Sequence, residues 1–144
     1  MSLDLQKYLS LFVAEAAEHL AGFGRNLVLL EEAARTGAGA SARDAIDSCF
    51  RHAHSVKGMA ASMRLDGISA LAHKAEDLVD VFRQDPARLD ADAVDELLSA
   101  SDVLQELVEA AATGANPPAD AASVERLVEV TRRHGATVQD VSLG

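Results

Sequence analysis

The sequence predicts an all-α protein, an up-down antiparallel helical bundle of four helices with a fifth helix at its C-terminal end. Apolar residues recur every three or four positions through most of the 144-residue chain, which is the spacing of amphipathic helices. All three prolines fall between such segments, and no segment shows the alternation of a strand. Because the segments are joined by short loops, consecutive helices are expected to pack antiparallel.

The first two predicted helices have recognisable limits. The first carries its apolar stripe from Leu5 to Leu30 and gives way to a glycine-rich loop at residues 36–40. The second opens at Ser41–Asp44, a segment that resembles a capping box, and its stripe continues to Met63. Both helices should therefore face one shared core.

The third and fourth predicted helices follow at once. Asp66 is expected to be the N-cap of the third, because a short acidic side chain can accept hydrogen bonds from the first free N–H groups. This helix should end just before Pro86, since the residue that precedes a proline resists the helical conformation. Asp90 is expected to cap the fourth helix in the same way.

The C-terminal part of the chain holds the clearest break, at residues 113–118, where Gly, Asn and two prolines meet. A shorter fifth helix is expected from about residue 120 to residue 133, with Gly135 as its C-cap. We therefore expect one domain at residues 1–135, and a tail or the start of a linker at residues 136–144.

Composition and charge narrow the possible environments and partners. Aromatic residues make up only 3% of the chain, so the core should consist of Leu, Val, Ile and Ala. The net charge of −10 argues against nucleic acid or an anionic membrane as a partner. The single cysteine, Cys49, lies in an apolar stripe and is expected to be a core residue. No leader opens the chain and no apolar run approaches ~18 residues, so a cytoplasmic location without membrane insertion is expected.

Four polar residues of the second and third predicted helices should come together. On a helical wheel, His54 lies about 120° from the centre of its apolar stripe, and Glu76 lies about 110° from its own, in the same sense. If Leu65 is the centre of the turn, both are 11 residues from it (65 − 54 and 76 − 65). His54 and Glu76 should be level, with Lys57 and His73 about one turn nearer the hairpin.

This placement suits a histidine that carries a phosphoryl group. A neutral imidazole nitrogen is a nucleophile towards phosphorus, and Glu76 could fix the proton on the other nitrogen of His54. Lys57 could balance phosphoryl charge, while His73 could bond to Glu76 or to the phosphoryl group. The small residue Gly58 would leave room for a docking protein.

The motif His54-Ser55-Val56-Lys57-Gly58, followed by His73 and Glu76, resembles the N-terminal histidine phosphotransfer (HPt) domain of CheA-type chemotaxis kinases. The strong resemblance covers residues 50–82, and the flanking helices resemble the family in layout. It implies that His54 is the phosphoacceptor, Glu76 its hydrogen-bond partner, and Lys57 with His73 an assisting pair.

The resemblance also implies partners. A kinase catalytic domain would supply the phosphoryl group from ATP, and an aspartate in the receiver domain of a response regulator would take it. The chain has no nucleotide-binding motif, so it is expected to be a carrier without enzymatic activity of its own. We expect the domain to be monomeric and to be part of a histidine protein kinase. Many family members have glycine where Met59 and Arg64 stand, and these departures concern partner specificity.

Two other functions stay open from the sequence. The chain could be a free-standing HPt carrier in a multistep phosphorelay, supplied by a response regulator instead of a kinase. It could also be a helical adaptor in which the histidine is never modified. The length of the full protein would separate a kinase from a free-standing carrier.

No cofactor or metal site is expected. Residues 73–76 have the order His-x-x-Glu, the reverse of the Glu-x-x-His of di-iron bundles. His52 and His54 are roughly 200° apart on one helix, so they cannot chelate one ion from that helix, and His52 is expected to be a bystander. His19 and His134 have no supporting partner in the sequence pattern.

Overall fold

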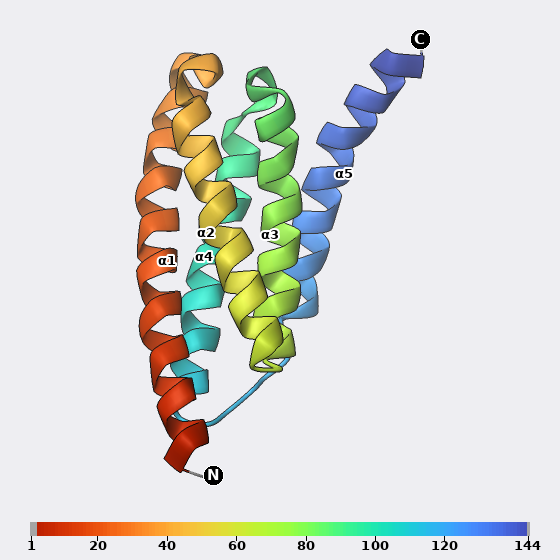
Figure 1. Ribbon diagram of the computed structural model, residues 1–144. Coiled ribbons are helices and arrows are strands. Elements are labelled where there is room, and N and C mark those ends of the chain that lie inside the picture. The colour runs from red at the N-terminus through yellow and green to blue at the C-terminus, as the bar shows by residue number, and fades with distance from the viewer. Residues whose placement is uncertain (1–2, 144) are drawn as a thin grey trace.

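The computed structural model describes the backbone of residues 3–143 and the side chains of residues 3–135. This part of the chain contains helices and no strand, which confirms the predicted all-α class. Figure 1 shows α1, α2, α3 and α4 running alongside one another as an up-down bundle, with α5 outside it against α3. The elements are α1 (Leu3–Thr36), the short 3-10 helix η1 (Gly39–Ala42), α2 (Arg43–Ser62), α3 (Asp66–Gln84), the 3-10 helix η2 (Pro86–Arg88), α4 (Ala91–Ala112) and α5 (Ala121–Leu143).

The core lies between the four bundle helices and is mainly aliphatic, as the composition predicts. Its largest fully buried side chains come from all five helices and are Leu20, Phe23, Leu27, Leu30, Ile46, Val56, Leu71, Leu78, Phe82, Leu97, Leu104 and Leu127. Burying one such side chain contributes roughly 1.5–3 kcal/mol. No described helix is both long and apolar enough to cross a membrane.

Cys49 belongs to this core. It is fully buried, and its thiol donates to the carbonyl of Phe23 at 3.9 Å. Burial raises the pKa of the Cys49 thiol to about 12, because a thiolate is costly in apolar surroundings. The prediction that this cysteine is a core residue is confirmed.

Three of the helices end in the same kind of turn, with one residue in the left-handed conformation. Gly37 (φ 72°) follows α1 and Gly114 (φ 87°) follows α4, whereas Arg64 (φ 58°) follows α2. After α2, the N–H of Leu65 donates to the carbonyl of Ala60, and that of Arg64 donates one turn back in α2. This is the hydrogen-bond pattern of a Schellman motif, which favours glycine at the position of Arg64.

The start of α2 differs from the predicted capping box. The 3-10 turn η1 precedes α2, and within it the Ser41 hydroxyl donates to the carbonyl of Ala38 at 2.7 Å. Helix α2 then begins at Arg43 with no side-chain cap. The prediction of a cap at Ser41 was wrong because the preceding turn uses that hydroxyl.

Of the two predicted aspartate caps, that of α3 was wrong and that of α4 is confirmed. The N-cap of α3 is Leu65, without a side-chain hydrogen bond, and Asp66 is the first helical residue. The predicted cap at Asp66 was therefore one residue too late, because the chain enters α3 directly from the turn that ends α2. The Asp90 carboxylate does accept from the N–H of Ala93 at 2.9 Å and caps α4, as predicted.

The connection from α4 to α5 is pressed against the α2–α3 turn. A methyl group added at Gly67 would lie 2.3 Å from the carbonyl oxygen of Pro117, so only glycine fits there. The Asn116 amide also donates to the carbonyl of Arg64, at 3.2 Å. These contacts hold the connection in place at the hairpin end of the bundle.

Helix α5 is longer than predicted. It continues through Gly135 to Leu143, so the expected C-cap at Gly135 and the end near residue 133 were wrong. A glycine inside a helix costs only about 1 kcal/mol relative to alanine, which does not by itself end the helix. The backbone of the expected tail is thus helical as far as residue 143, and the domain boundary at residue 135 stays a prediction.

Candidate functional site

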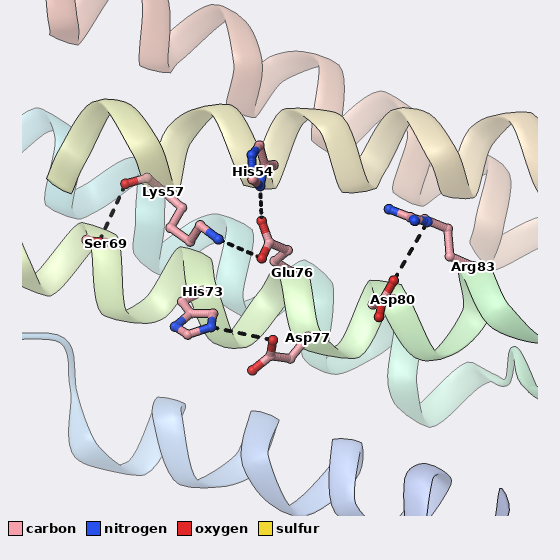
Figure 2. A network of polar contacts seen from close by, with 8 residues as sticks. All are labelled: His54, Lys57, Ser69, His73, Glu76, Asp77, Asp80 and Arg83. Atoms are coloured by element: carbon pink, nitrogen blue, oxygen red, sulfur yellow. Dashed lines mark hydrogen bonds and ion pairs between the residues drawn. The ribbon is translucent and has the colours of Figure 1, made fainter. Parts of the chain in front are cut away.

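The four predicted site residues lie on the paired helices α2 and α3 (Figure 2). His54 and Glu76 are level, as the spacing about the turn predicts, and His54 Nδ1 is 2.6 Å from Glu76 Oε2. The tight turn at residues 63–65 sets this register, because it leaves the two helices antiparallel with few residues between them.

Lys57 completes the contact. Its Nζ donates to Glu76 Oε1 at 2.8 Å, so His54 and Lys57 bind different oxygens of one carboxylate. Lys57 was expected one turn from that level, and its long side chain spans the difference. Glu76 is therefore the centre of the site, with a ring and a cation held on either side of it.

The charge state of Glu76 follows from two opposing effects. Burial on its own would raise the pKa of the carboxyl, because Glu76 is a buried residue. The hydrogen bonds and charges of Lys57 and His54 together outweigh burial and lower the pKa of Glu76 below its ordinary value. Glu76 is thus a carboxylate acceptor at neutral pH.

The exposure of His54 contrasts with that of its partner. The His54 side chain is 63% exposed, whereas that of Glu76 is 10% exposed. Since the carboxylate needs a donor, a neutral His54 carries its proton on Nδ1 and has its lone pair on Nε2. The nitrogen with the free lone pair, Nε2, is the one that does not contact Glu76.

The surface beside His54 is open. Gly58 lies one turn along α2, and a methyl group added there would meet no atom within 4 Å. Ala61, in the following turn, is also exposed. Another protein can therefore approach His54 across small side chains.

His73 pairs with a residue of its own helix, Asp77. Its Nε2 is 3.6 Å from Asp77 Oδ1, and both side chains are about half exposed. Of the two bonds considered for His73, to Glu76 or to a phosphoryl group, the one to Glu76 is not formed, and the Glu76 oxygens accept from His54 and Lys57. Ligand atoms of His73, Glu76 and Asp77 lie within 4.8 Å of one another, and Glu76 is at the same time the acceptor for His54 and Lys57.

Two residues beside the site were missed by the sequence analysis. The Phe50 ring stacks on that of His54, with centroids 5.9 Å apart and planes 13° from parallel. The Arg83 guanidinium carbon lies 3.9 Å from the centroid of Phe50. The spacing of Phe50 and His54, four residues on one helix, could have indicated the first contact.

The remaining histidines also have partners. His19 Nδ1 and His52 Nδ1 are 3.0 Å apart, so one ring donates to the other across α1 and α2. The His52 ring lies close to Gly22, where an added methyl group would be 2.5 Å from Nε2. Burial, followed by His19, Arg25 and Arg51, lowers the pKa of His52.

His134 likewise connects two elements. Its ring packs edge-on against Phe82, its Nδ1 donates to the carbonyl of Val130 at 2.7 Å, and its Nε2 is 3.0 Å from Asp90. The expectation that His19 and His134 lack partners was wrong, because their partners come from other helices or from another turn of the same helix.

Comparison with known proteins agrees with this geometry. Residues 7–114, more than half of the chain, match the family model of the Hpt domain. The chain therefore belongs to the Hpt domain family, which confirms the histidine phosphotransfer class that the sequence predicts.

Relatives within this family include chemotaxis proteins. The chain is 29% identical to the chemotaxis protein CheA of Bacillus subtilis over 132 residues, covering 92% of this chain and 19% of that protein. It is 33% identical to CheA of Treponema pallidum over 103 residues, or 72% of this chain and 12% of that protein. The chain thus spans about a fifth or less of the length of these curated relatives.

A solved structure shows the same fold. The phosphorylated P1 domain of CheA3 from R. sphaeroides, in complex with CheY6, superposes with a TM-score of 0.73 at 25% identity. The match covers 89% of this chain and 98% of that chain. The predicted resemblance to CheA-type HPt domains is confirmed.

Proposed function

We propose that this chain is a phosphocarrier in which His54 accepts a phosphoryl group on Nε2 and passes it to an aspartate of a response regulator. The observation that carries the proposal is the exposed imidazole whose Nδ1 is held 2.6 Å from a buried carboxylate. Such a contact keeps one nitrogen protonated and leaves the other as a nucleophile.

The transfer takes place in two displacements. The Nε2 lone pair of His54 attacks the γ-phosphorus of ATP, the N–P bond forms, and the bond from phosphorus to the bridging oxygen breaks as ADP leaves. The positive charge that the ring gains is balanced through Nδ1–H by the Glu76 carboxylate. An aspartate oxygen of the receiver then attacks phosphorus, the N–P bond breaks, and its electron pair returns to Nε2.

Lys57 and His73 assist without reacting. Lys57 is 27% exposed at its side chain, so it can turn from Glu76 towards phosphoryl oxygens while they are present. His73 is exposed beside it and can donate a hydrogen bond to the same group. The two residues offset negative charge that the phosphoryl group brings to the surface.

The proposed partners follow from the relatives. A CheA-type catalytic domain would supply ATP-derived phosphate, since the curated relatives are much longer proteins named CheA. A receiver domain would take it, as the solved P1 domain is in complex with CheY6. In this proposal the kinase activity lies outside the 144 residues, the carrier is monomeric, and the relay works in the cytoplasm.

The test is labelling of the 144-residue chain by ATP and the catalytic fragment of a CheA-type kinase. We expect an acid-labile, base-stable phosphoryl group on wild type and none on His54→Gln. The variant His52→Gln is the matched control, because it removes a histidine from the same helix and should keep the label. An unlabelled wild type, with the kinase active on its own HPt domain, contradicts transfer from a kinase. Labelling by a phosphorylated receiver domain alone would then indicate a free-standing relay carrier.

A further inference from the structure

We propose that Phe50 and Arg83 are positioning residues for phosphotransfer, which hold the His54 imidazole in the orientation that presents Nε2. The inference rests on the proposed function of His54. It assigns a role to two side chains that lie beside the hydrogen bonds among His54, Glu76 and Lys57.

The need for such residues arises from the exposure of His54. With 63% of its side chain exposed, the ring has few neighbours to restrain it. One hydrogen bond from Nδ1 to Glu76 fixes the position of one atom, but the ring can still swing about that contact. An exposed ring with a single restraint populates several rotamers, and only some of them present Nε2 to a partner.

Phe50 supplies the second restraint. It precedes His54 by one helical turn, and the two ring planes differ by only 13° at a centroid separation of 5.9 Å. Aromatic rings at this separation favour an offset-stacked arrangement. The stack fixes the plane of the imidazole, while Glu76 fixes the direction of Nδ1.

Arg83 in turn fixes Phe50. Its guanidinium carbon lies 3.9 Å from the centroid of the Phe50 ring, a separation at which a cation is attracted to the ring face. Arg83 Nε is also 3.7 Å from Asp80 Oδ1 on the same helix, which limits where the guanidinium can lie. Figure 2 shows Arg83 and Asp80 farther along α3 from Glu76, on the side away from His73.

Helix α3 therefore contributes to both restraints on the imidazole. Glu76 acts on His54 directly. Arg83, two turns after Glu76 in α3, acts through the Phe50 ring of α2. A planar guanidinium can lie flat on a ring, whereas an ammonium is a point charge. The proposal thus requires arginine at position 83 and an aromatic ring at position 50.

The first experiment measures the tautomer of His54 in the unphosphorylated chain, by two-bond proton–nitrogen NMR of the imidazole. Phe50→Leu should lower the ratio of the Nδ1–H to the Nε2–H form roughly two- to tenfold, and Phe50→Tyr should restore it. Arg83→Gln and Arg83→Lys should both lower it by a smaller factor. The control is Arg43→Gln, which removes an exposed arginine from the first turn of α2 and should change nothing.

The second experiment measures the reactivity of His54 without any partner protein, with phosphoramidate as donor. In that reaction the Nε2–P bond forms while the P–N bond of the donor breaks and ammonia leaves. Phe50→Leu should slow this step by the same factor as it lowers the tautomer ratio. The same variant should be phosphorylated by the kinase fragment more slowly by the same factor, with unchanged KM. That result would show that Phe50 acts on the imidazole and not on binding of the kinase.

Clear outcomes would overturn the proposal. An unchanged tautomer ratio in a folded Phe50→Leu variant means that Phe50 does not position the ring. A wild-type ratio in Arg83→Lys alongside a lowered ratio in Arg83→Gln means that charge alone acts and stacking does not. Because the NMR measurement needs no phosphoryl group, failure of wild type to be labelled would count against the proposed function without altering this result.

Discussion

His54 Nδ1 lies 2.6 Å from Glu76 Oε2, yet the two side chains differ sixfold in exposure, 63% against 10%. The proton that the two residues share is therefore held on the protein side of the ring, and the lone pair is left on Nε2. This separation anchors the imidazole to the bundle and leaves its other side exposed to solvent.

Replacing Glu76 by glutamine should slow phosphorylation of His54 by roughly tenfold or more, because the amide no longer fixes the tautomer or balances the charge of the ring. The rate of labelling by a CheA-type catalytic fragment measures this effect. Asp77→Asn is the matched control, since it removes a carboxylate that pairs with His73 instead. Equal rates for Glu76→Gln and wild type would exclude Glu76 from the reaction.

The same carboxylate should contribute to stability in a pH-dependent way. Lys57 and His54 lower the pKa of Glu76 from its ordinary 4.5 in the folded protein. The contribution is thus fully present above about pH 4.5 and is lost as the pH falls through the lowered value. We expect the difference in free energy of unfolding between wild type and Glu76→Gln to shrink from pH 7 to pH 3 in urea titrations. A constant difference would mean that ionisation of Glu76 plays no part.

The burial of His52 beside His19 predicts a second pH effect, at a higher pH than that of Glu76. Burial lowers the pKa of His52 from 6.5 in the folded state, so the unfolded chain binds the proton more readily. The free energy of unfolding should fall as the pH drops through about 6.5, and should fall less in His52→Gln. Replacing the exposed His73 by glutamine serves as control. Parallel curves for wild type and His52→Gln would refute this contribution.

Arg64 should be a site where a single change stabilises the fold. It has φ 58° at the end of α2, a conformation that glycine occupies after α1 and α4. Left-handed backbone costs roughly 1–2 kcal/mol for most residues, and the extra chain entropy of glycine offsets part of the gain. We expect Arg64→Gly to raise the free energy of unfolding by about 0.5–1 kcal/mol, while Arg64→Ala gives no such gain. A less stable glycine variant in chemical denaturation would contradict this.

Helix α5 should support the fold without taking part in the chemistry. Leu127 is 1% exposed in this helix, which packs against α3 and α4 and lies outside residues 7–114 of the family match. Leu127→Ala should cost roughly 2–5 kcal/mol of unfolding free energy and leave the labelling rate of the folded protein unchanged. The control is Val128→Ala at the exposed neighbouring residue, which should change neither the free energy of unfolding nor the labelling rate. If the Leu127→Ala variant is fully folded but is labelled much more slowly than wild type, α5 takes part in the phosphotransfer reaction.

How far the sequence predicts this molecule depends on the range of the interactions involved. The period of apolar residues gives the helices, and counting from the turn gives the level of His54 and Glu76, because both are local or depend on one short hairpin. The Asp90 cap is likewise a contact within one turn. Gly135 shows the limit of such signals, since a glycine is compatible with both the end and the interior of a helix.

Contacts between elements could not be predicted in this way. Ser41 has a good capping side chain, but the preceding 3-10 turn uses its hydroxyl. The pairing of His19 with His52 and the position of Arg83 over Phe50 depend on how two helices are rotated against each other. His73 pairs with Asp77, while His54 and Lys57 of α2 donate to Glu76.

The most direct test of the central claim is to identify the phosphorylated atom. The chain is labelled with ATP and the kinase fragment, and the modified ring is examined by two-bond proton–nitrogen and phosphorus NMR. We expect one phosphoryl group, on Nε2 of His54, with the proton on Nδ1. A phosphoryl group on Nδ1 of His54, or on His52 or His73, would contradict the role assigned here to the His54–Glu76 pair.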